Sequence, residues 1–346
     1  MNRCAWGVAL SILVAMTPGR ALLRAQGQPA SSGPIEVVRL HSDVYMLAGA
    51  GSNIAVQIGR EGVVLCDSGS TALAPAALAA IERITDQPIR YIINTSADPD
   101  HVGGNETLAK AGRSLFGGPS TDAAGGVGAS GAVATDRPAS IVATLKVFNR
   151  MSVPPGDEKP YPLTAQPTET LTRKRKNVYL NQQAIEIIEQ PAAHSDGDAI
   201  VFFRRSDVVC TGDIVDMTRF PMIDTKNGGT VQGEIAALNR LIELVIPSVP
   251  LPWKDGGTKV VPGHGRVAEQ GELVEYRDMV TVVRDTVQSL MKKGMNLQQI
   301  QAANPTQGYR NRYGTDSGPW TTDMFVEAIY TSLTSTGVRT QTRNTP

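Results

Sequence analysis

The sequence predicts a four-layer α/β sandwich over residues 35–270, followed by a C-terminal helical extension over 271–346. Short β-branched segments separated by Gly and Asp turns open the domain, and an Ala-rich helical pattern then leads into the strand-like YII of Tyr91–Ile93. The same order of strands, helix and strand returns between residues 177 and 264. Two such units, each with its helices outside its sheet, give layers in the order α, β, β, α.

In the first half, residues 35–69 alternate β-rich runs with turns, which is typical of a meander of strands. Apolar residues at helical spacing predict a helix over Leu73–Ile84. A second helix is expected to begin near Asn105, whose side chain could cap the free amides of the first turn.

Residues 113–170 are rich in Gly, Ala, Ser and Pro, and we interpret them as an insertion with one helix over about Ala139–Arg150. Its segment Gly117–Ala134 is expected to be a mobile lid over the site. Strands are then predicted at NVYL, AIEIIEQ, AIVFFRR and DVVCTGD, a helix at Gly233–Val245, a strand at TKVVPGHG, and helices from Gly271 to the end.

The N-terminus carries Arg3 and an apolar segment, Ala5–Met16, which is too short to span a bilayer and has the length of a signal-peptide core. We therefore expect a signal peptide over residues 1–25, cut after Ala21 or Ala25, and a Gly/Ser/Pro linker over 26–34. The mature protein is expected in the periplasm or secreted, without a membrane anchor.

Charge and cysteine content limit the function classes. The chain has 33 basic and 33 acidic residues, so nucleic acid is not an expected partner. The expected partner is a small-molecule substrate. Cys66 and Cys210 each end a β-rich apolar run and are expected to be buried free thiols, with a disulfide between them as the alternative. The sequence does not indicate an oligomeric state.

Histidine carries most of the functional information, because three of the four histidines stand beside Gly or Asp just past a predicted strand. These are His101 in DPDHVGG, His194 in PAAHSDGD and His264 in VPGHG, and Asp213 ends another apolar strand in CTGD. Loops at one edge of a sheet bring such side chains together, which is what a metal site requires. His41 has no such context and is expected to be structural.

The order NTSADPDHVGGN, AAHSDGD, CTGD and VPGHG resembles the metallo-β-lactamase superfamily, whose first motif is usually Thr-His-x-His-x-Asp-His followed by Gly-Gly. The resemblance covers about Ser32 to Val267 and includes GVVLCDSG, which places Asp67 at the family's strand-ending turn. It implies the αββα sandwich and a metal-dependent hydrolase, with β-lactams, thioesters, lactones and phosphodiesters among the family's substrates. One fold hosts many chemistries, so the substrate does not follow from it.

Carried onto this chain, the resemblance implies two metal positions. Asp100, His101 and His264 would form the second position, and Asp213 would bridge to the first. At the first position His194 is present, but Ser96 and Asp98 stand where the family usually has imidazoles. A neutral serine is a poor zinc ligand, whereas a carboxylate can ligate. A carboxylate there resembles the iron-binding motif of flavodiiron proteins, although no flavodoxin-like domain follows.

Three hypotheses remain open at this point. A single zinc ion sits on Asp100, His101, His264 and Asp213, as in the subclass of metallo-β-lactamases that works with one zinc. Alternatively Asp98, His194 and Asp213 hold a second ion, and the extra carboxylates favour iron or manganese over zinc. The third hypothesis is a degenerate, non-catalytic binding protein of the same fold.

If the protein is a hydrolase, Asp98, Asp100 and His194 are the expected catalytic residues. Asp98 would act as general base, and His194 would hydrogen-bond the water or the oxyanion. Ser96 would donate a hydrogen bond to a ligating carboxylate. Substrate contacts are expected from the segment after Asp213, from the insertion and from the loop Gly49–Asn53. An ester, lactone, thioester or β-lactam fits this chemistry.

Overall fold

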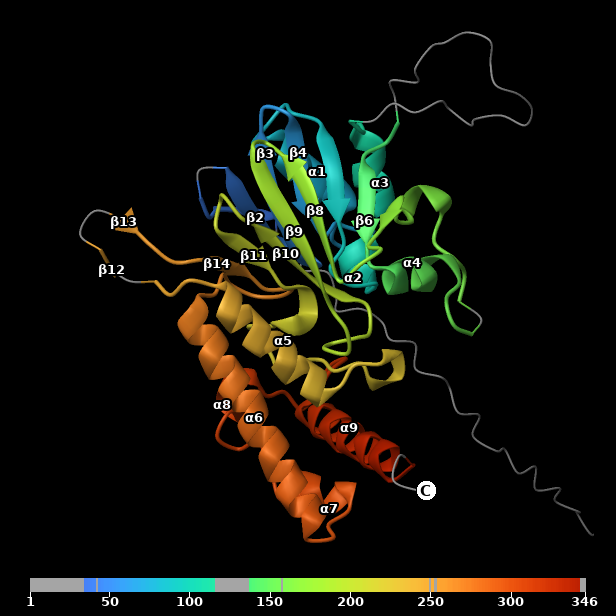
Figure 1. Ribbon diagram of the computed structural model, residues 1–346, viewed down its shortest axis with the longest axis vertical. Helices are drawn as coiled ribbons and strands as arrows, with labels where there is room; N and C mark the ends of the chain where they lie inside the picture. The colour runs from blue at the N-terminus through green and yellow to red at the C-terminus, as the bar shows by residue number, and fades with distance from the viewer. Residues whose placement is uncertain are drawn as a thin grey trace, which may run out of the picture.

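The computed structural model describes residues 34–41, 43–115, 137–156, 158–248, 250–251 and 254–342. The predicted four-layer sandwich is confirmed: two sheets pack face to face, and helices cover their outer faces (Figure 1). The expected signal peptide, residues 26–33 of the expected linker and the expected lid Gly117–Ala134 lie outside the described residues. Among the described helices, none is both long and apolar enough to cross a membrane.

The first sheet has seven strands in sequence order. Strands β1 to β4 form the predicted antiparallel meander, and β4 to β7 then pair in parallel. Parallel neighbours end at the same edge, so the loops that follow β4 and β5 lie side by side. The strands are β1 (Glu36–Arg39), β2 (Val44–Ala50), β3 (Ser52–Gly59), β4 (Gly62–Cys66), β5 (Ile89–Ile93), β6 (Ser140–Ala143) and β7 (Glu169–Thr170).

The second sheet has five strands in the order β14-β11-β10-β9-β8. Strands β8 to β11 are antiparallel neighbours, whereas β14 pairs with β11 in parallel, so the loops after β11 and β14 also share one edge. A short hairpin, β12–β13, precedes β14. The strands are β8 (Arg175–Leu180), β9 (Gln183–Gln190), β10 (Asp198–Phe203), β11 (Val208–Cys210), β12 (Pro250–Leu251), β13 (Lys254–Asp255) and β14 (Lys259–Val261).

The central core lies between the two sheets and follows from alternation along each strand. On β4, Val64 and Cys66 face the second sheet, while Val63 and Leu65 face the helices outside. Since both faces of β4 are covered, every residue of the strand is buried, which is why its sequence GVVLC reads as a continuous apolar run. Cys66 and Cys210 are buried free thiols as predicted, and burial, with Cys210 adjacent, raises the pKa of Cys66 well above its usual range.

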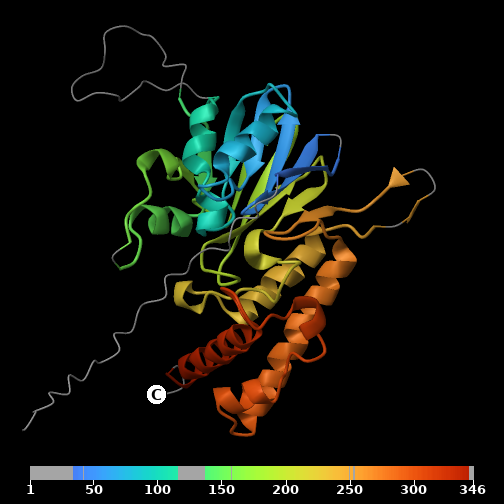
Figure 2. The ribbon, with the colours of Figure 1, turned by 180° about the vertical axis from the view of Figure 1, so that it is seen from behind.

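Helices on both outer faces complete the four layers. Helices α1 and α3 cover the first sheet, while α5 and the C-terminal helices α6 and α9 cover the second (Figures 1 and 2). The predicted extension is a set of separate helices below the sandwich rather than one continuous helix. The α-helices are α1 (Ala74–Glu82), α2 (Pro99–Val102), α3 (Asn105–Ala111), α4 (Leu145–Ser152), α5 (Val231–Leu244), α6 (Gln270–Lys292), α7 (Leu297–Ala302), α8 (Arg310–Tyr313) and α9 (Thr322–Thr342); the 3-10 helices are η1 (Leu163–Ala165), η2 (Gly212–Ile214) and η3 (Thr225–Asn227).

Two local predictions were wrong. The helix expected over Ala139–Arg150 is instead strand β6 followed by α4, because the β-branched SIVA pairs with β5 and Thr144 then caps the helix with its side chain. The insertion therefore contributes β6 and β7 to the first sheet. Asn105 does begin α3 but does not cap it, since its buried amide exchanges hydrogen bonds with Asn94 instead.

Candidate metal centre

All six predicted ligands converge at one edge of the sandwich. Asp98, Asp100 and His101 follow β5, with the last two in the one-turn helix α2, which the sequence did not predict. The other three follow strands of the second sheet: His194 after β9, Asp213 in the 3-10 helix η2 after β11, and His264 after β14. Whether these side chains bind metal stays a prediction, but their meeting point is the strand edge that the sequence indicated.

The second position consists of Asp100, His101 and His264, whose ligand atoms all lie within 4.8 Å of one another. His264 Nε2 is 3.2 Å from Asp100 Oδ2 and 3.3 Å from Asp213 Oδ1. His101 Nε2 also faces Asp213 Oδ1, at 3.1 Å. Asp213 therefore stands where a bridging carboxylate was expected.

The first position consists of Asp98, His194 and Asp213, again within 4.8 Å of one another. His194 Nε2 lies 2.8 Å from Asp98 Oδ2. Ser96 is buried, and its hydroxyl oxygen accepts a hydrogen bond from the Asp98 amide at 3.2 Å. The hydrogen bond expected from Ser96 to a ligating carboxylate does not occur among those seen in the described residues.

Two groups that the sequence analysis did not assign orient the imidazoles. Asp67, at a positive φ of 65°, places Oδ2 2.8 Å from His101 Nδ1 and is itself held by the backbone N–H and hydroxyl of Thr95. His194 Nδ1 donates to the carbonyl of Met222 at 2.6 Å. Each contact leaves Nε2 directed at the centre, the arrangement that metal-bound histidines usually have. The strand-ending motif CDSG is a sequence signal that could have indicated Asp67 as a partner of the centre. The Met222 carbonyl could not have been found in this way, because every residue has a backbone carbonyl.

The charged groups of the centre shift one another's pKa values. Burial alone would lower the pKa of His101, but the carboxylates of Asp213 and Asp67 outweigh it and raise that pKa well above its usual range. Burial would also lower the pKa of His194, but the carboxylate of Asp98 outweighs burial and raises that pKa well above its usual range. Burial would raise the pKa of Asp213, yet His101 and His264 hold it well below its usual range.

For His264, burial is again outweighed by Asp100 and Asp213, which raise its pKa to about 10. The raised pKa values of the three histidines and the lowered pKa of Asp213 favour imidazolium–carboxylate pairing when no cation is bound. A cation would take the place of the Nε2 protons, because imidazole ligates only when neutral. Three carboxylates and three imidazoles around a shared Asp213 fit one or two divalent cations, and the side chains of Asp98 and Asp100 remain 27% and 34% exposed to solvent.

The loop Gly49–Asn53 supports this centre from the backbone side. Ser52 donates to the carbonyl of Asp100 at 2.7 Å, and Asn53 donates to the carbonyls of Pro262 and Gly265 at 3.0 and 2.9 Å. The loop thus ties together the segments that carry Asp100 and His264. Its expected role in substrate contact stays a prediction.

A close approach at Gly263 makes room for the shared carboxylate. A Cβ on this residue would lie 2.5 Å from Asp213 Oδ1, closer than real Cβ contacts allow. The glycine before His264 in PGHG is therefore required by the position of Asp213.

The insertion reaches the centre through Tyr161. This partly buried side chain packs against the same small buried cluster as Ala97, the residue between Ser96 and Asp98. Burial and the charges of Asp98, Glu158 and Asp100 raise its pKa. The described part of the insertion therefore borders the site, as predicted, even though the expected lid lies outside the described residues.

A polar cavity of about 1010 Å³ lies at the other end of the sheets, lined by the turns Gly59–Glu61, Asn181–Gln182 and Arg205–Asp207. His41 lines it as well, away from the other three histidines, in keeping with the prediction that it takes no part in the centre. Groups capable of chemistry meet instead at the opposite edge, where the six ligand residues converge.

Comparisons with known proteins agree with this geometry. Residues 47–264 match the family model described as the metallo-beta-lactamase superfamily. The structure resembles a metallo-beta-lactamase from Pontibacter korlensis, with a TM-score of 0.52 and 17% identity over 71% of this chain and 99% of that one. It resembles the metallo-beta-lactamase DIM-1 with a TM-score of 0.51 and 12% identity, over 72% and 98% of the two chains.

A second kind of structure matches over more of the chain. The stereoselective inverting sec-alkylsulfatase Pisa1 from Pseudomonas sp. has a TM-score of 0.58 and 14% identity, over 86% of this chain and 50% of that one. A comparison with curated proteins gave no match. At these identities the likeness to solved structures concerns the fold.

Proposed function

The chain belongs to the metallo-beta-lactamase superfamily, and from that premise we propose that it is an exported, metal-dependent hydrolase that acts on a small molecule. The observation that carries the proposal is the convergence of Asp100, His101 and His264 in one group and of Asp98, His194 and Asp213 in the other. Structural ion pairs seldom place three imidazoles and three carboxylates at one accessible strand edge. Export is proposed from the N-terminal apolar segment Ala5–Met16.

The residues of the chain would divide the work as follows. Asp100, His101, His264 and Asp213 would hold one cation, and Asp98, His194 and Asp213 a second. A bound cation would supply a water acidified to near-neutral pKa and would polarise the substrate oxygen under attack. Asp98, which is partly open to solvent, would accept the proton of the water when the first position is empty. His194, whose Nε2 contacts Asp98, would donate its Nε2 proton to a developing oxyanion.

We propose an ester, lactone, thioester or β-lactam as the substrate. A sulfate ester is the second candidate, favoured by one specific observation. The match to the sec-alkylsulfatase covers 86% of the 346 residues, which is about 298 residues. Because only 269 residues precede α6, the matched part must include some of the C-terminal helices. The matches to the two metallo-beta-lactamases, at 71% and 72%, do not require them.

The alternative function is that of a non-catalytic binding protein of the same fold, in which the first position has lost its cation because Ser96 and Asp98 replace imidazoles. Metal dependence separates the two. Protein stripped by a chelator and reloaded with zinc, manganese or iron would be assayed against chromogenic esters, lactones, a thioester, a cephalosporin and a secondary alkyl sulfate. The hydrolase proposal expects turnover that requires one of the metals and disappears in His264→Ala. Stoichiometric metal without turnover of any substrate would support the binding protein.

A further inference from the structure

The segment Ile214–Asp224, here called the central loop, lies between the metal centre and the C-terminal extension. It begins directly after the shared ligand Asp213 and runs to η3. Its backbone contacts both metal positions on one side, and its aromatic residue Phe220 is buried among extension residues on the other.

On the metal side, the central loop holds one histidine of each position. The Met222 carbonyl accepts from His194 Nδ1 at 2.6 Å, and the Asp224 amide donates to the His194 carbonyl at 2.8 Å. The Met217 amide donates to the His264 carbonyl at 3.0 Å. The loop thus fixes the ring of His194 but only the backbone of His264.

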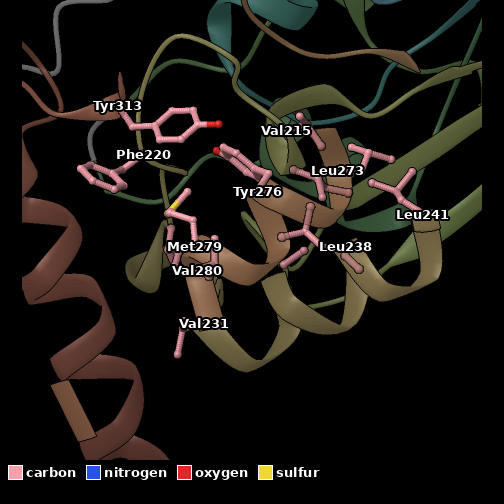
Figure 3. Close-up of a cluster of buried hydrophobic side chains, with 14 of the residues drawn as sticks. Val215, Phe220, Val231, Leu238, Leu241, Leu273, Tyr276, Met279, Val280 and Tyr313 are labelled. Atoms are coloured by element: carbon pink, nitrogen blue, oxygen red, sulfur yellow. The ribbon is translucent and has the colours of Figure 1, made fainter. Parts of the chain in front are cut away.

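On the other side, Phe220 anchors the loop in the extension. Its ring stacks on Phe325 of α9, with ring centroids 4.8 Å apart and planes 9° apart, and its amide donates to the carbonyl of Tyr313 at 3.1 Å. The Phe220 and Tyr313 rings lie next to each other, 5.9 Å between centroids, with Tyr276 of α6 close by (Figure 3). Phe220 is only 1% exposed, so the loop cannot shift without opening this cluster.

Polar contacts with the same helices reinforce the anchor. The Tyr276 hydroxyl donates to the carbonyl of Arg219 and accepts from the amide of Asp216, both at 3.4 Å. Asp216 in turn accepts from the amide of Thr218 at 2.7 Å and from the Arg219 guanidinium at 2.6 Å. Hydrogen bonds within the central loop therefore stabilise it in addition to the packing of Phe220.

We propose that the C-terminal extension is a positioning element of the metal centre, and that Phe220 is the positioning residue through which it acts on His194. Phe220 touches neither the reacting atoms nor a ligand. Through Met222 it keeps the Nδ1 proton of His194 engaged and so keeps Nε2 directed at Asp98 and the first position. The second position, whose His101 is oriented by Asp67 of the first sheet, depends on the extension much less. The inference rests on the proposed metal centre.

The test compares two Phe→Leu variants at equally buried sites. Phe220→Leu removes the anchor, whereas Phe203→Leu removes a fully buried ring between the sheets, away from the loop. Zinc and manganese affinities are measured by calorimetry on chelator-treated protein. The expected result is about 10–100-fold weaker binding at the first position in Phe220→Leu, the usual cost of losing an outer partner of a ligand, and no such loss in Phe203→Leu. Equal losses in both variants would overturn the proposal.

A second readout does not depend on metal. In the chelator-treated wild type, the Nδ1 proton of His194 should give a slowly exchanging downfield nuclear magnetic resonance signal, which persists in Phe203→Leu and disappears in Phe220→Leu. If Phe220→Leu does not fold, Tyr276→Phe keeps the ring and removes only the hydroxyl contacts, and it should speed this exchange. A signal unchanged in every folded loop variant would overturn the proposal. A wild type that shows the signal but binds no metal would refute the metal centre and the proposed function, while the positioning of His194 by Phe220 would stand.

Discussion

The two metal positions are built from the same loops but supported by different parts of the molecule. The second position has two imidazoles, and His101 is oriented by Asp67, a carboxylate at the end of β4. The first position has one imidazole, and His194 is oriented by a backbone carbonyl in a loop that the C-terminal helices hold. A charged partner raises the basicity of a ligating histidine more than a carbonyl does, so we expect the second position to bind its cation more tightly.

The comparison also bears on the identity of the cation. The second position offers two nitrogen donors and two carboxylates, a set that suits zinc. The first offers one nitrogen with carboxylates from Asp98 and Asp213, which suits iron or manganese as well. With Ser96 and Asp98 where imidazoles are usual, we therefore expect one position to bind its cation more weakly while the other is kept.

The largest expected effect comes from the residue that the two positions share. Asp213→Asn should remove metal from both and abolish hydrolysis, because it deletes the carboxylate that faces His101 and His264. The loss in affinity should exceed the about 10–100-fold that an outer partner of a ligand costs. Metal content after dialysis, measured by elemental analysis, checks this; retention of either ion would show that Asp213 does not bridge.

His264→Ala should separate the positions. It removes a ligand of the second position only, so the tightly bound ion should be lost, together with activity, while any ion at the first position remains. His41→Ala is the matched control, because His41 lies at the other end of the sheets. Equal metal contents in the two variants would contradict the assignment of His264.

Asp98→Asn tests the role of the first position. Loss of rate by about 10²–10⁴-fold with metal content unchanged would identify Asp98 as a general base, whereas loss of an ion would identify it as a ligand. Ser96→Ala should change little, because the hydrogen bond seen at its hydroxyl oxygen, among the described residues, comes from the Asp98 amide. Single-turnover rates with parallel metal analysis distinguish these outcomes; a variant with full rate and full metal would remove Asp98 from the mechanism.

The smallest expected effect is on the pH dependence of stability. Because the pKa of His264 in the folded, metal-free protein is about 10, above its ordinary value, its pairing with Asp100 and Asp213 stabilises the fold fully below about pH 6.5. This stability is lost as the pH rises toward 10. The Tm of metal-free protein should therefore fall across that range, by about 2–4 °C for each kcal/mol lost, and less steeply in His264→Gln. A flat profile for metal-free wild type would contradict the pairing.

Much of this centre could be predicted from the sequence, because its ligands sit in short loops next to strongly apolar strands. The flanking patterns of His101, His194 and His264 placed all three at one sheet edge, as the structure does. Strand β6 was missed because it forms by pairing with β5, whose partner residues lie 49 positions earlier in the chain, and such pairing leaves no local periodicity.

The orienting partners were harder to predict for a different reason. The contact of His194 with Met222 uses a backbone carbonyl, which any residue could provide. The dependence of that carbonyl on Phe220 and Phe325 joins segments about a hundred residues apart. Such long-range packing cannot be read from the spacing of one segment, and only the folded chain shows that the helical extension packs against the loop that contacts His194.

The most direct test of the account is the anomalous diffraction of crystals grown with zinc, recorded on both sides of the zinc absorption edge. We expect a strong peak among Asp100, His101 and His264 and a weaker one between Asp98 and His194, with Asp213 in contact with both. A peak at the first position alone, or none at either position in protein given excess zinc, would contradict it.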